Sequence, residues 1–318
     1  MILIDVGAAG DILPRFSGVK NKTIVAFEPD PEAFKDLQKK YSSQNYIIIN
    51  QALSSREQEI NINFTKKGEC SSIYKTNFKL IKKFPFAERF DVKTKAKIKT
   101  NTLDQALKTN GLEYPNYIKL DIQGAELEAL KGSIRSLKTI CCIELEIEFA
   151  ELYENQPLFS EIEQFLRQNG FEVWDIRRVF QKEKNSLFHG FKKGRLVSGD
   201  ALFFKNPKKL HDDLKTLKDS DWNQIINYSA EIAKVYGYSD YAVDLINSAP
   251  SNRDKDLVNK NFNFTKKDRL TTDSLFSKGR YKLSKFLSEK LFSLAQRIEP
   301  YDSGFKIGDS RLGNKKIK

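Results

Sequence analysis

Small and acidic residues near the start of the chain have the spacing of a nucleoside-binding turn. The run Asp5-Val6-Gly7-Ala8-Ala9-Gly10 directly follows a short apolar segment, and Glu28 ends the next apolar segment. Small residues after a strand let a ligand approach the backbone closely, and an acidic side chain one strand later can accept hydrogen bonds from both hydroxyls of a ribose. Because the run lacks the full G-x-G-x-x-G spacing, it indicates either NAD or S-adenosylmethionine without deciding between them. The alternative is that Gly7 only permits a tight turn and Glu28 only begins a helix.

A second set of candidate residues lies in the run Lys119-Leu120-Asp121-Ile122-Gln123-Gly124-Ala125-Glu126, where an apolar segment leads into a helical pattern. Lys119 and Asp121 are two positions apart, so they share one face of a strand and we expect an ion pair between them. Asp121 is the candidate general base or acceptor-orienting group, with Glu126 close to it. The alternative for Asp121 is an N-terminal cap on the helix that starts near Ala125.

Three glutamates alternate along the next predicted strand and share one of its faces: Glu144, Glu146 and Glu148. They either bind hydroxyl groups of an acceptor or form a solvated strand end. The neighbouring Cys141 and Cys142 are predicted core residues. His189 and His211 show no metal-ligand spacing with the cysteines, so we expect no zinc site.

Together these motifs resemble those of the FkbM-type methyltransferases. The following segments match that family in order and spacing: Asp5-Val6-Gly7-Ala8, Phe27-Glu28-Pro29-Asp30, Asn50-Gln51-Ala52-Leu53-Ser54, Thr102-Leu103-Asp104 and the run that contains Asp121. Gly199-Asp200-Ala201-Leu202-Phe203 is similar to the family's last strand, so the resemblance covers about residues 1–205. Gln123 stands where the family usually carries glutamate, and no helices precede the first strand in this sequence.

The resemblance implies a class I methyltransferase fold with S-adenosylmethionine as the methyl donor. It further implies transfer to a hydroxyl oxygen of a sugar or natural product. The cofactor positions that it implies are Asp5, Gly7, Ala8 and Glu28, with Gln51 and Ala52 at the adenine. On the acceptor side it implies Asp121 and Glu126, and we add Lys119 as the partner of Asp121.

Short apolar segments alternate with helical patterns up to residue 206. Strands are predicted at 2–6, 23–27, 46–49, 117–122, 140–147, 171–176 and 201–204, and helices at 31–41, 125–137 and 161–169. This alternation predicts an α/β, Rossmann-like sheet that is mostly parallel, with an antiparallel pair at one edge. Ligands of such sheets bind outside the carboxyl ends of the strands, where the candidate residues lie.

We divide the chain into a methyltransferase domain, 1–206, and a helical extension with a frayed basic tail, 207–318. After Asn206-Pro207 no further strand is expected. Helices are predicted at 222–236, 241–247 and 282–298. The apolar face of 282–298 is expected to pack on the catalytic domain or on a second subunit, which leaves a homodimer open, and its lysines leave peripheral membrane contact as a weaker alternative.

The chain is basic, with 54 Lys and Arg against 42 Asp and Glu and a net charge of +12. Eleven basic and three acidic residues fall within 65–99, interleaved with phenylalanines. An anionic partner is expected there, and we predict a lid or arm that faces an anionic acceptor. The alternative is a solvated loop.

Composition and charge leave three classes of function. The leading one is O-methylation of a saccharide in polysaccharide or glycolipid assembly. RNA methylation fits the charge, but the sequence lacks an Asn/Asp-Pro-Pro-aromatic motif for a flipped base, so a nucleic-acid partner is not expected. The third is a binding module that has the fold without the activity. Three cysteines, no apolar run near 18 residues and no signal-peptide pattern predict a soluble cytoplasmic protein.

Overall fold

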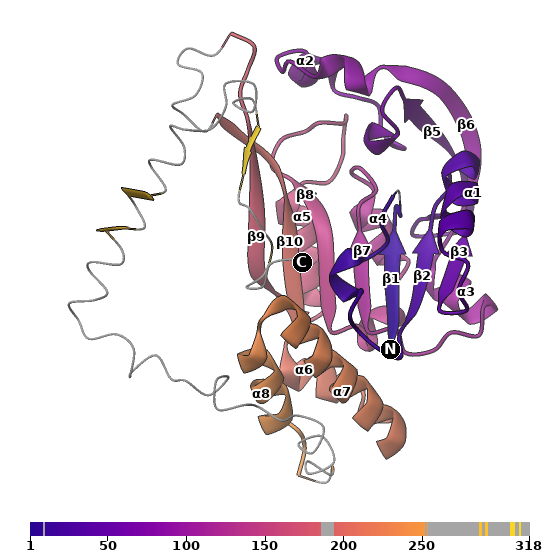
Figure 1. The fold of residues 1–318 in the computed structure, drawn as a ribbon, viewed down its shortest axis with the longest axis vertical. Helices are drawn as coiled ribbons and strands as arrows, with labels where there is room; N and C mark the ends of the chain where they lie inside the picture. The colour runs from indigo at the N-terminus through magenta and orange to yellow at the C-terminus, as the bar shows by residue number, and fades with distance from the viewer. Residues whose placement is uncertain are drawn as a thin grey trace.

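The computed structural model describes residues 1–8, 10–185, 194–251, 253, 286–287, 290–291, 306–308 and 312. Its main sheet has the strand order β11-β9-β10-β8-β7-β1-β2-β3, and a smaller sheet has the order β4-β6-β5 (Figure 1). The strands are β1 (Ile2–Val6), β2 (Thr23–Phe27), β3 (Tyr46–Ile49), β4 (Ala52–Leu53), β5 (Gln58–Thr65), β6 (Val92–Asn101), β7 (Tyr117–Leu120), β8 (Cys142–Glu148), β9 (Phe171–Gln181), β10 (Arg195–Lys205) and β11 (Lys306–Gly308). The α-helices are α1 (Pro31–Lys40), α2 (Phe78–Ile81), α3 (Leu103–Thr109), α4 (Glu126–Lys131), α5 (Phe159–Gln168), α6 (Pro207–Asp213), α7 (Asp219–Tyr236) and α8 (Ser239–Asn247).

The main sheet is parallel on one side and antiparallel on the other. β3, β2, β1, β7 and β8 pair in parallel, whereas β10 pairs antiparallel with both β8 and β9. The predicted Rossmann-like α/β class is therefore confirmed. The expectation that no strand follows Asn206 is wrong, because β11 pairs antiparallel with β9. The single helix predicted over 125–137 is also wrong: α4 stops at Lys131, and a separate 3-10 turn follows at Ser136–Lys138.

The smaller sheet was not predicted. β5 and β6 pair antiparallel, and β4 adds two residues parallel to β6. Phe84 and Phe90, from the basic segment 65–99, are buried in small apolar clusters of their own. The segment therefore carries a packed structure, not an extended arm, while Lys79, Lys82 and Lys83 stay exposed on its surface.

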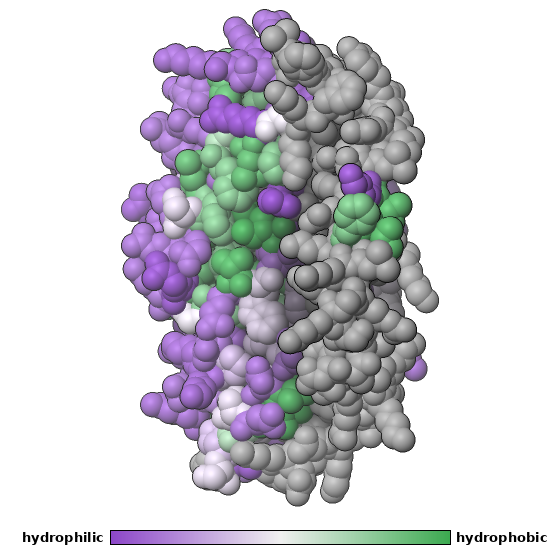
Figure 2. Space-filling view, turned by 90° about the vertical axis from the view of Figure 1, so that its left-hand side faces the viewer, coloured by the Kyte–Doolittle hydropathy of each residue, from purple (hydrophilic) through white to green (hydrophobic). Residues whose placement is uncertain are grey.

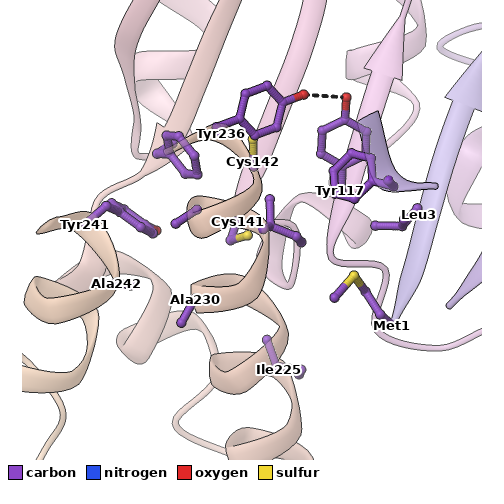
Figure 3. Packing of buried hydrophobic residues seen from close by; sticks show 14 of the residues in the cluster. Met1, Leu3, Tyr117, Cys141, Cys142, Ile225, Ala230, Tyr236, Tyr241 and Ala242 are labelled. Atoms are coloured by element: carbon purple, nitrogen blue, oxygen red, sulfur yellow. Dashed lines mark hydrogen bonds between the residues drawn. The ribbon is translucent and has the colours of Figure 1, made fainter. Parts of the chain in front are cut away.

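Helices cover both faces of the main sheet. One face, with Ile143 and Leu145 of β8, packs against α3, α4 and α5. The other face, with Leu3, Tyr117 and Cys142, packs against α7 and α8 in a second buried cluster. Figure 3 shows this second cluster from close by, with side chains of α7 and α8 against those of β1, β7 and β8. Cys141 and Cys142 are fully buried in it, as predicted for core residues.

The three helices that follow β10 lie at one end of the sheet. In Figure 1, α6, α7 and α8 lie near the end where β1 begins, and α2, β5 and β6 lie toward the opposite end. The parallel strands run from the first end to the second. Helices α6, α7 and α8 therefore support the end of the sheet where β1 begins, and the smaller sheet lies toward the end that carries the candidate residues.

β9 forms most of one side of the described molecule. β11 pairs only with residues 179–181 of this strand, so Val173, which is 39% exposed, lies beyond that pairing. On this side apolar residues gather in one area, with hydrophilic residues along its left edge (Figure 2). Trp174 packs edge-on against Phe204 and Tyr241, which ties the start of β9 to α8.

Most of the predicted helix 282–298 lies outside the described residues. Its described positions, Phe286, Leu287, Lys290 and Leu291, are helical with exposed side chains. No helix among the described residues is both long enough and apolar enough to span a membrane.

Candidate functional site

The face of the sheet that contacts α7 and α8 changes from apolar to charged toward the carboxyl ends of its parallel strands. β1 passes from Leu3 to Asp5, and β2 from Ala26 to Glu28, which directly follows it. The neighbouring strands follow the same alternation, in the order Tyr117, Lys119 and Asp121 along β7, and Cys142, Glu144, Glu146 and Glu148 along β8. Because side chains on one face recur at every second residue, this pattern brings the predicted residues to one end of one face.

Asp5 lies at the centre of this polar end and is 2% exposed. Its Oδ2 accepts a hydrogen bond from the Leu13 backbone N–H at 3.3 Å. Its Oδ1 accepts no hydrogen bond from the described residues, and Lys119 Nζ lies 3.8 Å from it. Burial raises the pKa of Asp5 to about 6, although the charge of Lys119 acts to lower it. Asp5 is therefore a buried carboxylate with spare capacity to accept a hydrogen bond.

The turn after β1 touches the backbone of the turn after β7. Gly7 has φ +81°, and a Cβ on it would lie 2.1 Å from the carbonyl oxygen of Asp121. No other residue type fits both the conformation and the contact. Gly7 and Ala8 both donate their backbone N–H groups to the carbonyl of Phe27, at 3.0 and 3.2 Å. The turn is therefore pinned between β2 and β7, next to Asp5.

Glu28 follows β2 and is 7% exposed. Its Oε1 accepts the Asp30 backbone N–H at 2.8 Å, and Asp30 in turn caps α1. Burial raises the pKa of Glu28 to about 7, and the charges of Asp30 and Asp5 add to the effect. No cation among the described residues compensates this carboxyl, so it gains from any ligand that donates hydrogen bonds to it.

Gln51 and Ala52 lie on the chain that leaves β3 for the smaller sheet. The Asn50 side chain donates to the carbonyl of Glu28 at 2.8 Å, which holds this chain beside the end of β2. Ala52 begins β4 and pairs with Thr100. Both residues are half-buried, and they directly follow Asn50, which contacts Glu28. Their role at the adenine stays a prediction.

Lys119 and Asp121 form the predicted ion pair, with Lys119 Nζ 3.4 Å from Asp121 Oδ2. Burial acts to lower the pKa of Lys119, but the charges of Asp121, Asp5 and Glu144 outweigh it and the pKa is raised. The alternative role for Asp121 as a helix cap is wrong, because α4 is preceded by Ala125 and no side chain caps it. Asp121 is 42% exposed, which leaves its carboxylate accessible to a ligand.

Gln123 connects the Asp121 turn to three other parts of the chain. Its side-chain amide donates to Asp121 Oδ1 at 3.2 Å and to Glu146 Oε2, and its Oε1 accepts the Tyr153 hydroxyl at 2.9 Å. Its backbone carbonyl accepts the Ser72 hydroxyl at 2.6 Å. Sequence analysis missed Ser72 and Tyr153, which are 51 and 30 positions from Gln123, because no local spacing marks such long-range partners.

Glu126 is fully buried behind the same turn. Its Oε1 accepts the Ile122 backbone N–H at 2.8 Å, whereas its Oε2 has no hydrogen-bond partner among the described residues. Burial raises the pKa of Glu126 to about 7, and the charge of Asp121 adds to the effect. The geometry gives Glu126 a role in holding the turn, since its side chain does not reach the surface.

Two more carboxyls complete the acidic end of this face. Burial, with neighbouring carboxylates adding to its effect, raises the pKa of Glu146 and of Glu148 well above the ordinary value. Glu148 is 1% exposed, so a solvated strand end is wrong for this residue. Asp200, on β10, pairs with Arg177. Within the described residues, no group of three or more His, Cys, Asp or Glu side chains is arranged to hold a metal ion.

Comparison with known proteins gives one family match. The model described as the methyltransferase FkbM domain matches residues 5–173. Among solved structures, the chain is similar to a methyltransferase FkbM from Methylobacillus flagellatus, with 18% identity and a TM-score of 0.37 over 64% of this chain and 42% of that one. It therefore spans less than half of that protein's chain.

Two other solved structures show the same range of similarity. A putative RNA methyltransferase from Pyrococcus horikoshii has 11% identity and a TM-score of 0.32 over 64% of this chain and 74% of that one. The magnesium protoporphyrin IX methyltransferase from Synechocystis, solved with bound S-adenosylmethionine, has 11% identity and a TM-score of 0.32 over 64% of this chain and 69% of that one. No curated protein matches the chain.

Proposed function

The chain belongs to the FkbM methyltransferase family, and from this membership we propose that it transfers a methyl group from S-adenosylmethionine to a hydroxyl oxygen of a saccharide, in a polysaccharide or glycolipid precursor. The observation that carries the proposal is the Asp121 carboxylate, whose side chain is 42% exposed, at the end of a face where Asp5, Glu28 and Glu148 are buried. One accessible carboxylate among hydrogen-bonding groups suits removal of a proton from a neutral hydroxyl.

The residues near the ends of β1 and β2 fit the donor. S-adenosylmethionine supplies an electrophilic methyl group on a positively charged sulfur. Asp5 has one carboxylate oxygen without a hydrogen-bond donor among the described residues, and it suits the ammonium group of the methionine part. Glu28 is buried without a cation, and its carboxylate suits the two hydroxyls of the ribose. Gln51 and Ala52, beside Glu28, would contact the adenine.

On the acceptor side, we assign proton removal to Asp121. The proton of the acceptor hydroxyl would pass to a carboxylate oxygen of Asp121 while the hydroxyl oxygen bonds the methyl carbon. The carbon–sulfur bond of the donor would break in the same step, and its electron pair would stay on the sulfur of the departing thioether. Lys119 and the Gln123 amide contact different oxygens of this carboxylate, at 3.4 and 3.2 Å, and so fix its orientation. Such a positioned base contributes roughly 10²–10⁴-fold to the rate.

The acidity of the site favours a neutral reacting group. A phosphate brought to Asp121 would be repelled by the carboxyl groups around it. These are Glu126, Glu146 and Glu148, which interact electrostatically with one another or with Asp121. Anionic groups of the acceptor would instead lie farther out, at the exposed lysines 79, 82 and 83. An RNA acceptor is favoured only by the net charge of +12.

The donor assignment is tested by calorimetric titration with S-adenosylmethionine. Glu28→Ala removes a charge-assisted acceptor of hydrogen bonds, each worth about 1.5–3 kcal/mol, so we expect affinity to fall by at least about tenfold. Glu32→Ala, an exposed carboxyl on α1, is the matched control and should change affinity less than twofold. Absence of binding by the unchanged protein would instead favour the binding-module alternative.

The acceptor assignment is tested with S-adenosylmethionine labelled in its methyl group. The protein is incubated separately with neutral oligosaccharides, with uronic-acid oligosaccharides and with ribosomal RNA. We expect label in a saccharide fraction, in an ether linkage that resists alkali. Label in RNA alone would make the protein an RNA methyltransferase.

A further inference from the structure

The hydroxyl of Tyr236 contacts the polar end of the sheet from a helix outside the residues that the family model matches, 5–173. Tyr236 is the last residue of α7 and is fully buried. Its hydroxyl donates to Glu144 Oε2 and lies 2.9 Å from the hydroxyl of Tyr117. Figure 3 shows the two hydroxyls directed at each other, one from α7 and one from β7. The Tyr117 hydroxyl also donates to Glu144 Oε2, at 3.3 Å.

Glu144 in turn lies next to the cation of the site. Glu144 and Lys119 are register partners on the adjacent parallel strands β8 and β7, and both occupy the face described above. Lys119 Nζ lies 3.8 Å from Asp5 Oδ1 and 3.4 Å from Asp121 Oδ2. A single ammonium group therefore stands among three carboxylates. Asp5 belongs to the proposed donor site and Asp121 to the proposed acceptor site.

We propose that Tyr236 is a positioning residue for methyl transfer, because its hydroxyl binds Glu144 and thereby leaves Lys119 to pair with Asp5 and Asp121. The inference rests on the proposed function. Glu144 is half-buried, and a carboxylate partly removed from water gains from hydrogen-bond donors or a cation. An ammonium group offers three donors that can turn toward it. Loss of the Tyr236 hydroxyl removes one of the two hydroxyls that donate to Glu144 Oε2 and leaves only the longer bond from Tyr117, and Lys119 then turns toward Glu144.

The predicted consequence concerns the ionisation of Asp5. Asp5 interacts electrostatically with five ionisable groups of the described residues: Tyr117, Lys119 and Asp121 at β7, Glu144 on β8, and Glu28 after β2. Of these only Lys119 favours the charged form of Asp5. When Lys119 turns away, the pKa of Asp5 rises, and a ligand that needs the Asp5 carboxylate binds less tightly below neutral pH.

The experiment measures the affinity of the full-length protein for S-adenosylmethionine by calorimetry between pH 5.5 and 8. We expect the affinity of the unchanged protein to fall as pH falls toward 6, where Asp5 takes up a proton. Tyr236→Phe should move the midpoint of this fall upward by about half a pH unit and weaken binding at pH 5.5 by about two- to threefold. Tyr241→Phe is the matched control: its hydroxyl is equally buried in the extension but donates to the backbone carbonyl of Lys205 at 2.7 Å. It should leave the midpoint unmoved.

A second variant separates a role through Glu144 from a loss of packing. Glu144→Gln keeps an oxygen that accepts the Tyr236 hydroxyl but carries no charge to attract Lys119. In that background Tyr236→Phe should no longer move the midpoint. Equal shifts from Tyr236→Phe and Tyr241→Phe, or an unchanged shift in the Glu144→Gln background, would overturn the positioning role alone. No binding by the unchanged protein at any pH would overturn the proposed function together with this inference.

Discussion

One face of the main sheet is apolar at one end and charged at the other, and this difference in polarity along one face is larger than the difference between the two faces at the apolar end. At the end where β1 begins, the face carries Leu3, Tyr117 and Cys142, and α7 and α8 bury it. Two to four residues farther along the same strands, the same face carries Asp5, Asp121 and Glu146. The opposite face stays apolar along its length and is covered by α3, α4 and α5. One face of the sheet is thus divided between stability and chemistry.

This division explains why the helices after residue 206 matter to a site they do not contain. The apolar end must be covered, since each large side chain buried there contributes roughly 1.5–3 kcal/mol. α7 and α8 supply that cover, and the last residue of α7 reaches the boundary with the charged end. We therefore propose that the segment 207–249 completes the methyltransferase fold, within the extension that begins at residue 207.

Removing the helices that cover the apolar end should have the largest effect of the changes considered, because it exposes that end to water. A chain truncated after Asn206 loses α6, α7 and α8, and with them the buried side chains of Trp222, Ile226 and Tyr236. We expect a chain without a cooperative thermal transition, measured by circular dichroism. The full-length protein is the control. A soluble truncated chain that melts cooperatively and binds S-adenosylmethionine would show that the apolar end needs no cover from this segment.

At the charged end, the largest expected effect comes from the contact between two turns. Gly7→Ala places a Cβ 2.1 Å from the Asp121 carbonyl oxygen at a φ of +81°, so the β1 and β7 turns must separate. We expect S-adenosylmethionine affinity to fall by more than about a hundredfold, or about 2.7 kcal/mol. Gly10→Ala is the matched control, because Gly10 also has a positive φ, +91°, but no atom within 4 Å of the added Cβ. Equal losses from both variants would assign the effect to φ alone.

Asp121→Asn should separate turnover from binding of the methyl donor. The variant keeps the shape of the side chain and loses its charge, so we expect kcat to fall about 10²-fold while S-adenosylmethionine affinity changes less than threefold. Transfer of labelled methyl to the saccharide acceptor measures the first quantity, and calorimetry measures the second. Unchanged turnover would remove Asp121 from the role of base.

Sequence predicted most of the helices that cover the apolar end, at 222–236 and 241–247, but not their contact with the charged end. Contiguous apolar runs located β1, β2 and β3 to the residue, and the rule that ligands bind at carboxyl ends of parallel strands then placed Asp5 and Glu28 together. The contact of Tyr236 with Glu144, 92 positions away, leaves no periodic trace in either segment.

The smaller sheet escaped sequence prediction for a different reason. Along β6, lysines 93, 95, 97 and 99 alternate with Thr94, Ala96, Ile98 and Thr100. The alternation has the period of a strand, but Thr and Ala make its inner face only weakly apolar. The lysines are the stronger signal, and they indicate a charged lid or arm, not a strand. The burial of Phe84 and Phe90 depends on Tyr153 and Ala150, which are distant in sequence.

The smallest expected effect concerns the cost of burying carboxyls at the charged end. The pKa of Glu126 is raised from about 4.5 to about 7 by burial, with the charge of Asp121 adding to it, so the folded protein holds this proton more tightly than the unfolded chain does. The stabilisation is fully present below pH 4.5 and is lost as pH rises through 7. Between pH 5 and pH 8 the loss amounts to roughly 2 kcal/mol from this group. Glu126→Gln cannot ionise and retains an oxygen for the Ile122 N–H, so it should flatten the pH dependence by that amount. Urea unfolding of both proteins at pH 5 and pH 8 measures it, with exposed Glu32→Gln as the control that leaves the slope unchanged. If Glu126→Gln and the unchanged protein lose the same unfolding free energy between pH 5 and pH 8, ionisation of Glu126 is not the source of that loss. Burial of carboxyls would then carry no measurable cost at the charged end.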